Sequence, residues 1–273
     1  MLKYVMIQLS VAILKYVEFK KKHHLYSKQR QNMKKYRFTG ETKIVNGVTL
    51  HRIVAVRSFS NVKEGDVGGW IEKEDDNLSH YGDCWVYDDA AVYDNATVCG
   101  NATVRGNSLV CEDATICGNA TVHDNAIVCG DAMVYGNALI CEDATVCGNA
   151  KIYNNAAVWG DAMVCAHALI YGDAAVHGDA TVCGYAKIYN NVTVWGNALI
   201  YGDTKIYNNA LICGDTTVCG DAKIYNDATV CDNATVCGNA TVCGNAIVCG
   251  NATVRGDVKV SGNTLVHGDK IVC

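Results

Sequence analysis

The sequence contains no proline, although its 273 residues include 26 glycines. Proline is one of the residues that dominate turns, so its absence argues against a loop-rich enzyme. Positive charge is not in excess either, because 28 acidic residues outweigh 23 lysines and arginines and leave a net charge of −5. A dedicated nucleic-acid-binding protein usually carries a basic patch, and we therefore expect no nucleic-acid partner.

No apolar run in the sequence is long enough to cross a membrane as a helix. Residues 1–32 contain eleven uncharged, mostly apolar residues between Lys3 and Lys15, and six lysines and one arginine against one glutamate. We expect them to form a basic and apolar extension without stable membrane insertion. The apolar run has the length of a signal-peptide core, but no small-residue cleavage site follows it. Export through this segment is therefore an alternative to the cytoplasmic location that we expect.

From Gly82 onward the sequence repeats in hexads of the form Gly-(Asn/Asp)-Ala-x-(Val/Ile)-x. A series of 32 valines and isoleucines runs without interruption from Val86 to Val272, and a small residue, usually alanine, lies two positions before each. This alternation places both residues on one face of a short strand. The Gly-Asn or Gly-Asp pair tolerates positive φ and indicates a corner. The repeat therefore predicts a solenoid with residues 82–273 in its coils.

Outward-facing residues indicate that three hexads make one coil. The position after the branched residue carries tyrosine in every third hexad, at Tyr135, Tyr153, Tyr171, Tyr189, Tyr207 and Tyr225. On another face the same position carries cysteine at the same interval, at Cys111, Cys129, Cys147, Cys165 and Cys183. Stacked positions in a solenoid tend to carry the same side chain, so we predict an all-β, three-sided parallel β-helix. At 18 residues per coil it has between ten and eleven coils and a length of roughly 50 Å.

The hexad motif resembles the left-handed parallel β-helix of the hexapeptide-repeat acyltransferases. The segment before it, residues 33–86, resembles the leading segment of the YdcK-like branch of that superfamily. The landmarks are Gly68-Gly69-Trp70-Ile71-Glu72, Asn77-Leu78-Ser79 and Cys84-Trp85-Val86. The resemblance implies a left-handed solenoid. It also implies a possible acyl transfer activity, in which a histidine acts as general base in a cleft between the subunits of a trimer.

A small β segment over residues 33–81 is expected to cap the solenoid. Residues 41–56 have the pattern of a β-hairpin, with Asn46-Gly47 as the signal for a type I′ turn. Such a hairpin would cover the strand edges of the first coil. The last repeat reaches Cys273 without a comparable cap, and we expect its open edges to favour end-to-end pairing, contact with another subunit, or fraying.

The first face of the predicted prism is apolar and carries no lysine and a single arginine, Arg255. Its outward residues include Leu109, Cys111, Ile127, Cys129, Cys147, Met163, Cys165 and Cys183. A flat apolar strip is a candidate protein–protein surface. We predict that the chain forms a dimer or trimer through this face, as a structural or interaction module without enzymatic activity.

The second face combines the tyrosine series with lysines, as in Lys187/Tyr189 and Lys205/Tyr207. Stacked tyrosines stabilise one another, and the lysine stems lie beside them. The favoured interpretation is a solvated aromatic ladder that stabilises the coil. The alternative is an oligomer that binds or sequesters a small nucleotide-like ligand by stacking.

The third face carries the residue types that catalysis uses. His123, Cys141, Trp159, His177 and Trp195 occupy its outward positions. In the acyltransferase interpretation, His123 or His177 would be the general base and acyl-coenzyme A the donor. The acyltransferases usually interrupt the solenoid with a loop that helps to build the cleft, whereas these repeats are unbroken. We therefore favour the non-enzymatic interpretation, which requires no cofactor.

Fifteen of the sixteen cysteines occupy the position after the branched residue, and only Cys84 occupies the inward position of alanine. Stacked thiols about 4.8 Å apart are within reach of disulfide formation, so export would favour disulfides. There is no CxxC motif, and a straight column of thiols offers about two ligands to a metal that requires four. We therefore predict reduced thiols in a cytosolic protein and no metal site.

Overall fold

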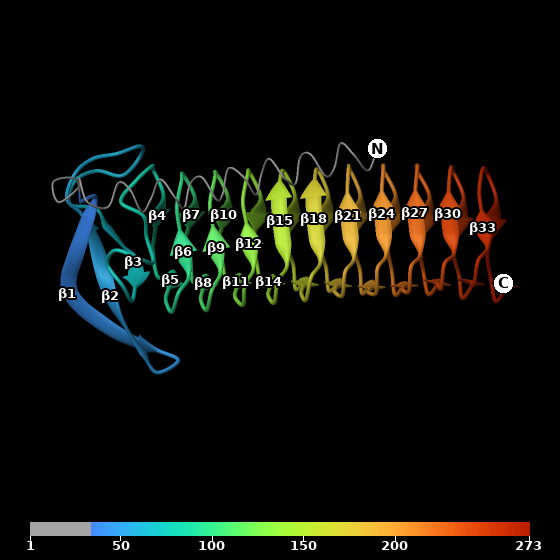
Figure 1. Cartoon of the computed structure of the whole chain (residues 1–273), viewed down its shortest axis with the longest axis horizontal. Helices are drawn as coiled ribbons and strands as arrows, with labels where there is room; N and C mark the ends of the chain where they lie inside the picture. Colours follow the sequence, from blue (N-terminus) through green and yellow to red (C-terminus); the bar gives the residue numbers. More distant parts are fainter. Residues whose placement is uncertain (1–33) are drawn as a thin grey trace. The chain divides into compact units, whose positions relative to one another are not determined.

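The computed structural model describes residues 34–273, so the extension predicted for residues 1–32 lies outside the described part of the chain. Within residues 34–273 every regular element is a β-strand, and none is a helix. Accordingly, no helix in this part of the chain is long and apolar enough to span a membrane. The strands stack along the axis of a three-sided solenoid, with one hairpin at its beginning (Figure 1). The predicted all-β solenoid is confirmed.

Three sheets form the three sides, and from β4 onward each of them contains every third strand of the chain. The first face is the 14-stranded sheet of β1 (Tyr36–Val45), β2 (Val48–Ala55), β3 (Val67–Ile71), β5 (Ala91–Val92), β8 (Leu109–Val110), β11 (Ile127–Val128), β14 (Thr145–Val146), β17 (Met163–Val164), β20 (Thr181–Val182), β23 (Leu199–Ile200), β26 (Thr217–Val218), β29 (Thr235–Cys237), β32 (Thr253–Arg255) and β35 (Ile271–Val272). The second face is the ten-stranded sheet of β6 (Thr97–Val98), β9 (Thr115–Ile116), β12 (Met133–Val134), β15 (Lys151–Asn154), β18 (Leu169–Gly172), β21 (Lys187–Tyr189), β24 (Lys205–Tyr207), β27 (Lys223–Tyr225), β30 (Thr241–Cys243) and β33 (Lys259–Val260). The third face is the 11-stranded sheet of β4 (Trp85–Val86), β7 (Thr103–Val104), β10 (Thr121–Val122), β13 (Leu139–Ile140), β16 (Ala157–Val158), β19 (Ala175–Val176), β22 (Thr193–Val194), β25 (Leu211–Ile212), β28 (Thr229–Val230), β31 (Ile247–Val248) and β34 (Leu265–Val266).

The strand register confirms that one coil contains three hexads. Val122 of β10 pairs with Ile140 of β13, and Ile152 of β15 pairs with Ile170 of β18, in parallel. Backbone hydrogen bonds connect the coils at every level, as from the amide of Thr121 to the carbonyl of Ala138 at 2.9 Å. Strands of two or three residues are too short to be stable alone, so each depends on the coils before and after it.

One continuous core of stacked small and branched residues fills the solenoid. Alanine and the following branched residue point inward, and both are fully buried in most coils, as for Ala120 and Val122. Burial of apolar surface is the main stabilising contribution along the whole length. A few inward positions depart from alanine and hold Ser108, Val192, Thr204 and Thr216, all of them fully buried.

The corners depend on residues that adopt positive φ. Glycine occupies most of them, as at Gly118 (φ 71°), and asparagine or an acidic residue occupies others, as at Asn208 (φ 56°) and Asp124 (φ 60°). The next residue forms side-chain ladders, in which Asn101 donates to Asn119 and Asn119 donates to Asn137, each at 3.0 Å. These ladders extend the hydrogen-bonded stacking of the strands into the corners.

The hairpin predicted over 41–56 is present and begins earlier, at Tyr36. Strands β1 and β2 pair antiparallel, and Asn46 (φ 50°) and Gly47 (φ 82°) form the turn with the two positive φ values of type I′. Strand β3 pairs antiparallel with β2 and parallel with β5 of the first coil. The hairpin therefore extends the sheet of the first face beyond the coils.

A pair of glycines allows the close approach of β3 to the first coil. A β-carbon at Gly68 would lie 2.7 Å from the Trp85 ring, and one at Gly69 would lie 2.6 Å from the carbonyl oxygen of Ala90. Nothing larger than hydrogen fits at these positions, which explains why two glycines precede Trp70.

Candidate functional site

The first face brings the predicted apolar residues into two adjacent columns. Leu109, Ile127 and Met163 precede the buried branched residue of their strands, and the cysteines follow it. Ile127 is 36% exposed, Met163 42% and Leu199 39%, whereas Cys111 is buried. In the outward positions of this sheet from β5 to β35, Arg255 is the single charged residue. The first face is therefore a strip of partly exposed apolar side chains interspersed with threonines, with almost no charge.

Two thiols of this strip, Cys129 and Cys165, are held in the neutral form. Burial raises the pKa of Cys165 from 9.0 to about 11, and the neighbouring thiols Cys183 and Cys147 add to the shift. Burial likewise raises the pKa of Cys129 to about 12, assisted by Cys111 and Cys147. Because a thiolate at Cys129 or Cys165 would face other thiols rather than a cation, both of these thiols stay protonated at neutral pH.

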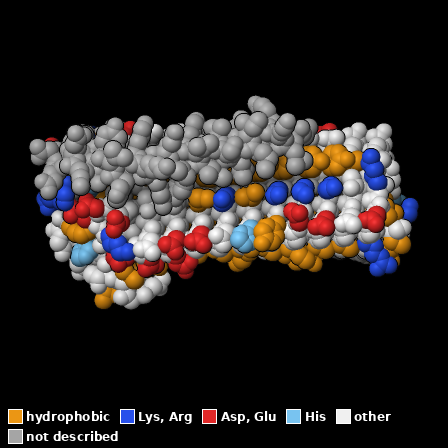
Figure 2. Space-filling view, in the orientation of Figure 1, with side chains coloured by type: hydrophobic (Ala, Val, Ile, Leu, Met, Phe, Trp, Pro, Cys, Tyr) orange, Lys and Arg blue, Asp and Glu red, His pale blue; other side chains and the backbone are white. Residues whose placement is uncertain are grey.

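The second face carries the predicted tyrosine ladder. The rings are nearly parallel, with centroids 4.8 Å apart for Tyr153 and Tyr171 and 5.1 Å apart for Tyr189 and Tyr207. The six residues in contact are Tyr135, Tyr153, Tyr171, Tyr189, Tyr207 and Tyr225. Basic side chains of the same strands lie in a row along the molecule (Figure 2). The rings stack on one another, so each inner tyrosine already uses both of its faces.

The third face stacks His177 between two tryptophans. The ring centroids of Trp159 and His177 lie 4.4 Å apart with planes 4° apart, and those of His177 and Trp195 lie 6.4 Å apart. Burial lowers the pKa of His177 from 6.5, with an opposing influence from Glu142. His177 is therefore a neutral ring at pH 7 that fills an aromatic column.

The two histidines that the acyltransferase interpretation singles out do not share a site. His123 follows β10 and His177 follows β19, which are three coils apart in the sheet of the third face. Trp159 and Cys141 occupy the intervening outward positions. His123 and His177 therefore have different neighbouring residues, and a catalytic site at one of them would not include the other.

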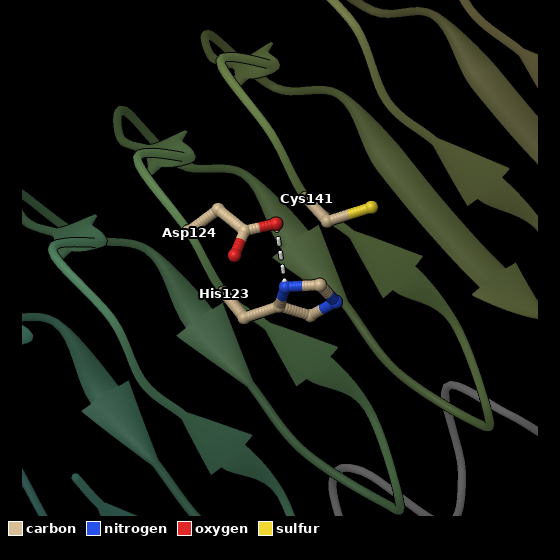
Figure 3. Close-up of side chains that lie close together, drawn as sticks. All are labelled: His123, Asp124 and Cys141. Carbon is tan, nitrogen blue, oxygen red and sulfur yellow. Dashed lines mark ion pairs between the residues drawn. The ribbon is translucent and has the colours of Figure 1, made fainter. Parts of the chain in front are cut away.

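His123 instead lies in a cluster with Asp124 and Cys141. The Nδ1 atom of His123 is 2.8 Å from an Oδ atom of Asp124, and one donor atom from each of the three residues lies within 4.8 Å of the other two (Figure 3). A second cluster of the same kind joins Cys231, Asp232 and Cys249. The hexad pattern places His123 and Cys141 in one column, but it assigns Asp124 to a corner and so does not predict the cluster. An aspartate directly after an outward histidine or cysteine is common to both clusters.

A second aromatic pair was also not anticipated from the sequence. His167 and Tyr185 stack with centroids 4.8 Å apart, at a corner and not on a face. Both residues occupy the corner position that usually carries asparagine or aspartate, one coil apart. Corner positions can therefore carry ladders of their own.

The comparisons with known proteins agree with the predicted resemblance. The family model of the YdcK β-solenoid repeat matches residues 114–130 and 236–250. Over 64 residues the chain is 36% identical to the uncharacterized acetyltransferase YdcK of Escherichia coli (strain K12). This match covers 20% of this chain and 19% of that protein. The matched segment thus spans about a fifth of this relative. The resemblance to YdcK-like hexapeptide-repeat proteins is confirmed.

One solved structure is also similar to part of the chain. The UDP-N-acetylglucosamine acyltransferase of Francisella novicida matches 62% of this chain and 62% of its own, with 16% sequence identity and a TM-score of 0.31.

Proposed function

We propose that this protein, a YdcK-like β-solenoid, is a non-enzymatic module that associates with further copies of itself through the first face. The observation that carries the proposal is the strip around Ile127, Met163 and Leu199, where large apolar side chains are 36–42% exposed. Exposed apolar strips of this kind mark interaction surfaces. The cysteines between these side chains are small, and burial keeps the thiol of Cys165 neutral by raising its pKa, so they extend the apolar surface.

A second copy of the chain is the partner that this strip suits best. The strip is straight, repeats with the coil and contains Arg255 as its one charge, so it is complementary to itself across a two-fold axis. Association in this way would bury the apolar columns of both chains at once. It needs no cofactor, and we propose a reducing cytoplasmic location in which the thiols stay free.

Charge introduced into the strip tests this proposal. We expect the triple variant Cys129→Lys, Cys147→Lys, Cys165→Lys to be monomeric, because burying three ammonium groups in an apolar interface is strongly unfavourable. The measurement is the mass in solution of the full chain in reductant, by light scattering after size exclusion. The wild-type chain is expected as a discrete oligomer.

The matched control is the double variant Tyr171→Lys, Tyr189→Lys, which adds charge to the second face. It should assemble like the wild type. A monomeric wild-type chain, or loss of assembly in the control but not in the triple variant, would contradict the choice of the first face. Circular dichroism of each variant shows whether the solenoid is intact.

Acyl transfer is the second candidate function, supported by the name of the curated relative, an acetyltransferase, over the 64 matched residues. His123, paired with Asp124, is its better candidate base, because His177 is enclosed between two tryptophans. Turnover of acetyl-coenzyme A over a panel of acceptors that His123→Ala abolishes would replace the non-enzymatic proposal. Binding of a nucleotide-like ligand between subunits is less well supported, since the tyrosine rings are stacked on one another.

A further inference from the structure

One corner of the third face gathers three different metal-binding side chains. His123 contributes an imidazole, Asp124 a carboxylate and Cys141 a thiol, and one donor atom of each lies within 4.8 Å of the other two (Figure 3). We propose that these three residues bind a single divalent cation of borderline softness, Zn²⁺. The sequence predicted no metal site because a column of outward residues offers two ligands. The corner aspartate supplies the third.

The backbone holds the three donors in place before any ion binds. Strands β10 and β13 pair in register, so His123 and Cys141 occupy the same column one coil apart. The amide of His123 donates to the carbonyl of Ile140 at 3.0 Å. Asp124 adopts φ 60°, and its carboxylate accepts a hydrogen bond from the amide of Glu142 at 3.3 Å as well as facing His123. Most of the ordering that a metal site requires is therefore already present.

Small side-chain rotations are enough to close the site. Bonds to zinc of about 2.0–2.3 Å place tetrahedral ligands roughly 3.3–3.7 Å from one another. The donors of the cluster lie within 4.8 Å, and each can approach by rotation about its own side-chain bonds. The Asp124 side chain is 54% exposed, so an ion reaches the cluster from solvent and the fourth position is open to water.

The donor set selects among cations. A nitrogen, an oxygen and a sulfur ligand together suit Zn²⁺, whereas Mg²⁺ and Ca²⁺ prefer oxygen ligands throughout. Binding as thiolate and carboxylate compensates the two positive charges of the ion. Zinc binds cysteine as the thiolate, so binding of the ion releases the thiol proton.

The same arrangement recurs six coils further along the third face. Cys231 and Cys249 occupy one column, and Asp232 lies between them at the corner with φ 61°. The Asp232 carboxylate accepts a hydrogen bond from the amide of Gly250 at 2.9 Å, which fixes it in the same way. Two sulfur ligands and one oxygen ligand again suit zinc. The part of the chain that the structure describes, residues 34–273, is therefore expected to bind two ions.

Cobalt titration of the full chain tests the proposal. The protein is stripped with chelator, kept in a phosphine reductant that does not compete for metal, and titrated with Co²⁺. We expect thiolate-to-cobalt charge-transfer and tetrahedral d–d absorption that saturates at two equivalents and is displaced by Zn²⁺. Cys141→Ser and His123→Gln should each lose one of the two equivalents, and Asp124→Asn should weaken that equivalent at least tenfold.

The matched control is Cys147→Ser, because Cys147 lies in a thiol column of the first face and is followed by glycine and not by a carboxylate. It should retain both equivalents. Thermal unfolding gives a second readout, since Zn²⁺ should raise the midpoint less in Cys141→Ser than in the control. Equal loss in Cys147→Ser, unchanged stoichiometry in Cys141→Ser, or no saturable cobalt spectrum in the wild type would each overturn the site. These outcomes do not depend on whether the first face associates.

Discussion

At the scale of single residues, the buried hydroxyl groups at inward positions differ in whether they have a hydrogen-bond partner. Ser108, Thr204 and Thr216 all replace alanine in the core and are fully buried. The Ser108 hydroxyl donates to the carbonyl of Arg105 at 2.8 Å. The hydroxyls of Thr204 and Thr216 have no hydrogen-bond partner among the described residues. A buried hydroxyl without a partner is destabilising by about 1–3 kcal/mol, so these two threonines weaken the coils that they occupy.

Replacing these threonines by valine should stabilise the protein. Thr204→Val and Thr216→Val keep the branched shape and remove the hydroxyl, and Val192 already occupies an equivalent inward position. We expect each change to raise the free energy of unfolding by about 1 kcal/mol, measured by urea denaturation. The control Ser108→Ala removes a satisfied hydroxyl and should not stabilise. Equal effects in all three variants would mean that the threonine hydroxyls have partners.

At the scale of the elements, the corners between the short strands differ in how strongly they require glycine. Gly130 (φ 69°) and Gly256 (φ 80°) occupy the same type of corner on different coils. A β-carbon at Gly130 would lie 2.6 Å from the amide nitrogen of Gly148 in the next coil, whereas one at Gly256 would meet nothing within 4 Å. Ala166 (φ 57°) holds such a corner, so a β-carbon is accommodated where the coils adjust. The backbone conformation alone therefore does not decide how strongly a corner requires glycine. The contact with the backbone of the next coil contributes as well.

The pair Gly130→Ala and Gly256→Ala separates these two contributions. Both variants bear the cost of positive φ, about 1–2 kcal/mol, and only Gly130→Ala adds a steric clash between coils. We expect Gly130→Ala to be more destabilising by about 1 kcal/mol or more, measured from the midpoints of thermal unfolding. If the two midpoints fall equally, the backbone conformation alone determines the preference for glycine.

At the scale of the whole molecule, columns of like groups give the protein a collective response to pH. Thiols of the first face lie in a column, as Cys129, Cys147 and Cys165 do, and the second face carries a column of tyrosines. Burial raises the pKa of Cys165 to about 11, of Cys129 to about 12 and of Tyr189 to about 12. The unfolded chain loses these protons at lower pH than the folded chain. The folded state is therefore disfavoured progressively as pH rises above the unfolded values.

The contribution of these thiols to stability should be constant below pH 9 and be lost above it. A raised thiol pKa leaves stability intact below the ordinary value of 9.0 and removes it between 9.0 and about 11 for Cys165. Tyrosines add their share only above 10.0. The double variant Cys129→Ser, Cys165→Ser should show a shallower decrease between pH 9 and 10 in thermal midpoints measured in reductant. Tyr171→Phe should match the wild type in that range, and a double variant with the wild-type slope would contradict the assignment.

Particular residues show how far the candidate sites were predictable. The columns of Cys129 and Tyr171 follow from the interval of three hexads, because a parallel ladder repeats its outward side chains without a change of register. The separation of His123 from His177 follows from the same count. The cluster of His123 with Asp124 and Cys141 did not, because it depends on how a corner side chain turns back toward its neighbours. That direction is a property of φ and of contacts one coil away.

The architecture follows from the sequence alone, because the uninterrupted series from Val86 to Val272 predicts a solenoid and the 18-residue interval of its outward tyrosines and cysteines makes the coil three-sided. The hairpin at Asn46-Gly47 was equally evident, because its turn has a local signature. Three features became evident only from the folded chain. They are the start of the cap at Tyr36, the stacking of His167 on Tyr185, and the group of donor atoms around Asp124. The physical reason is that periodicity specifies where a side chain is attached. Its rotation and partners are specified by packing between coils.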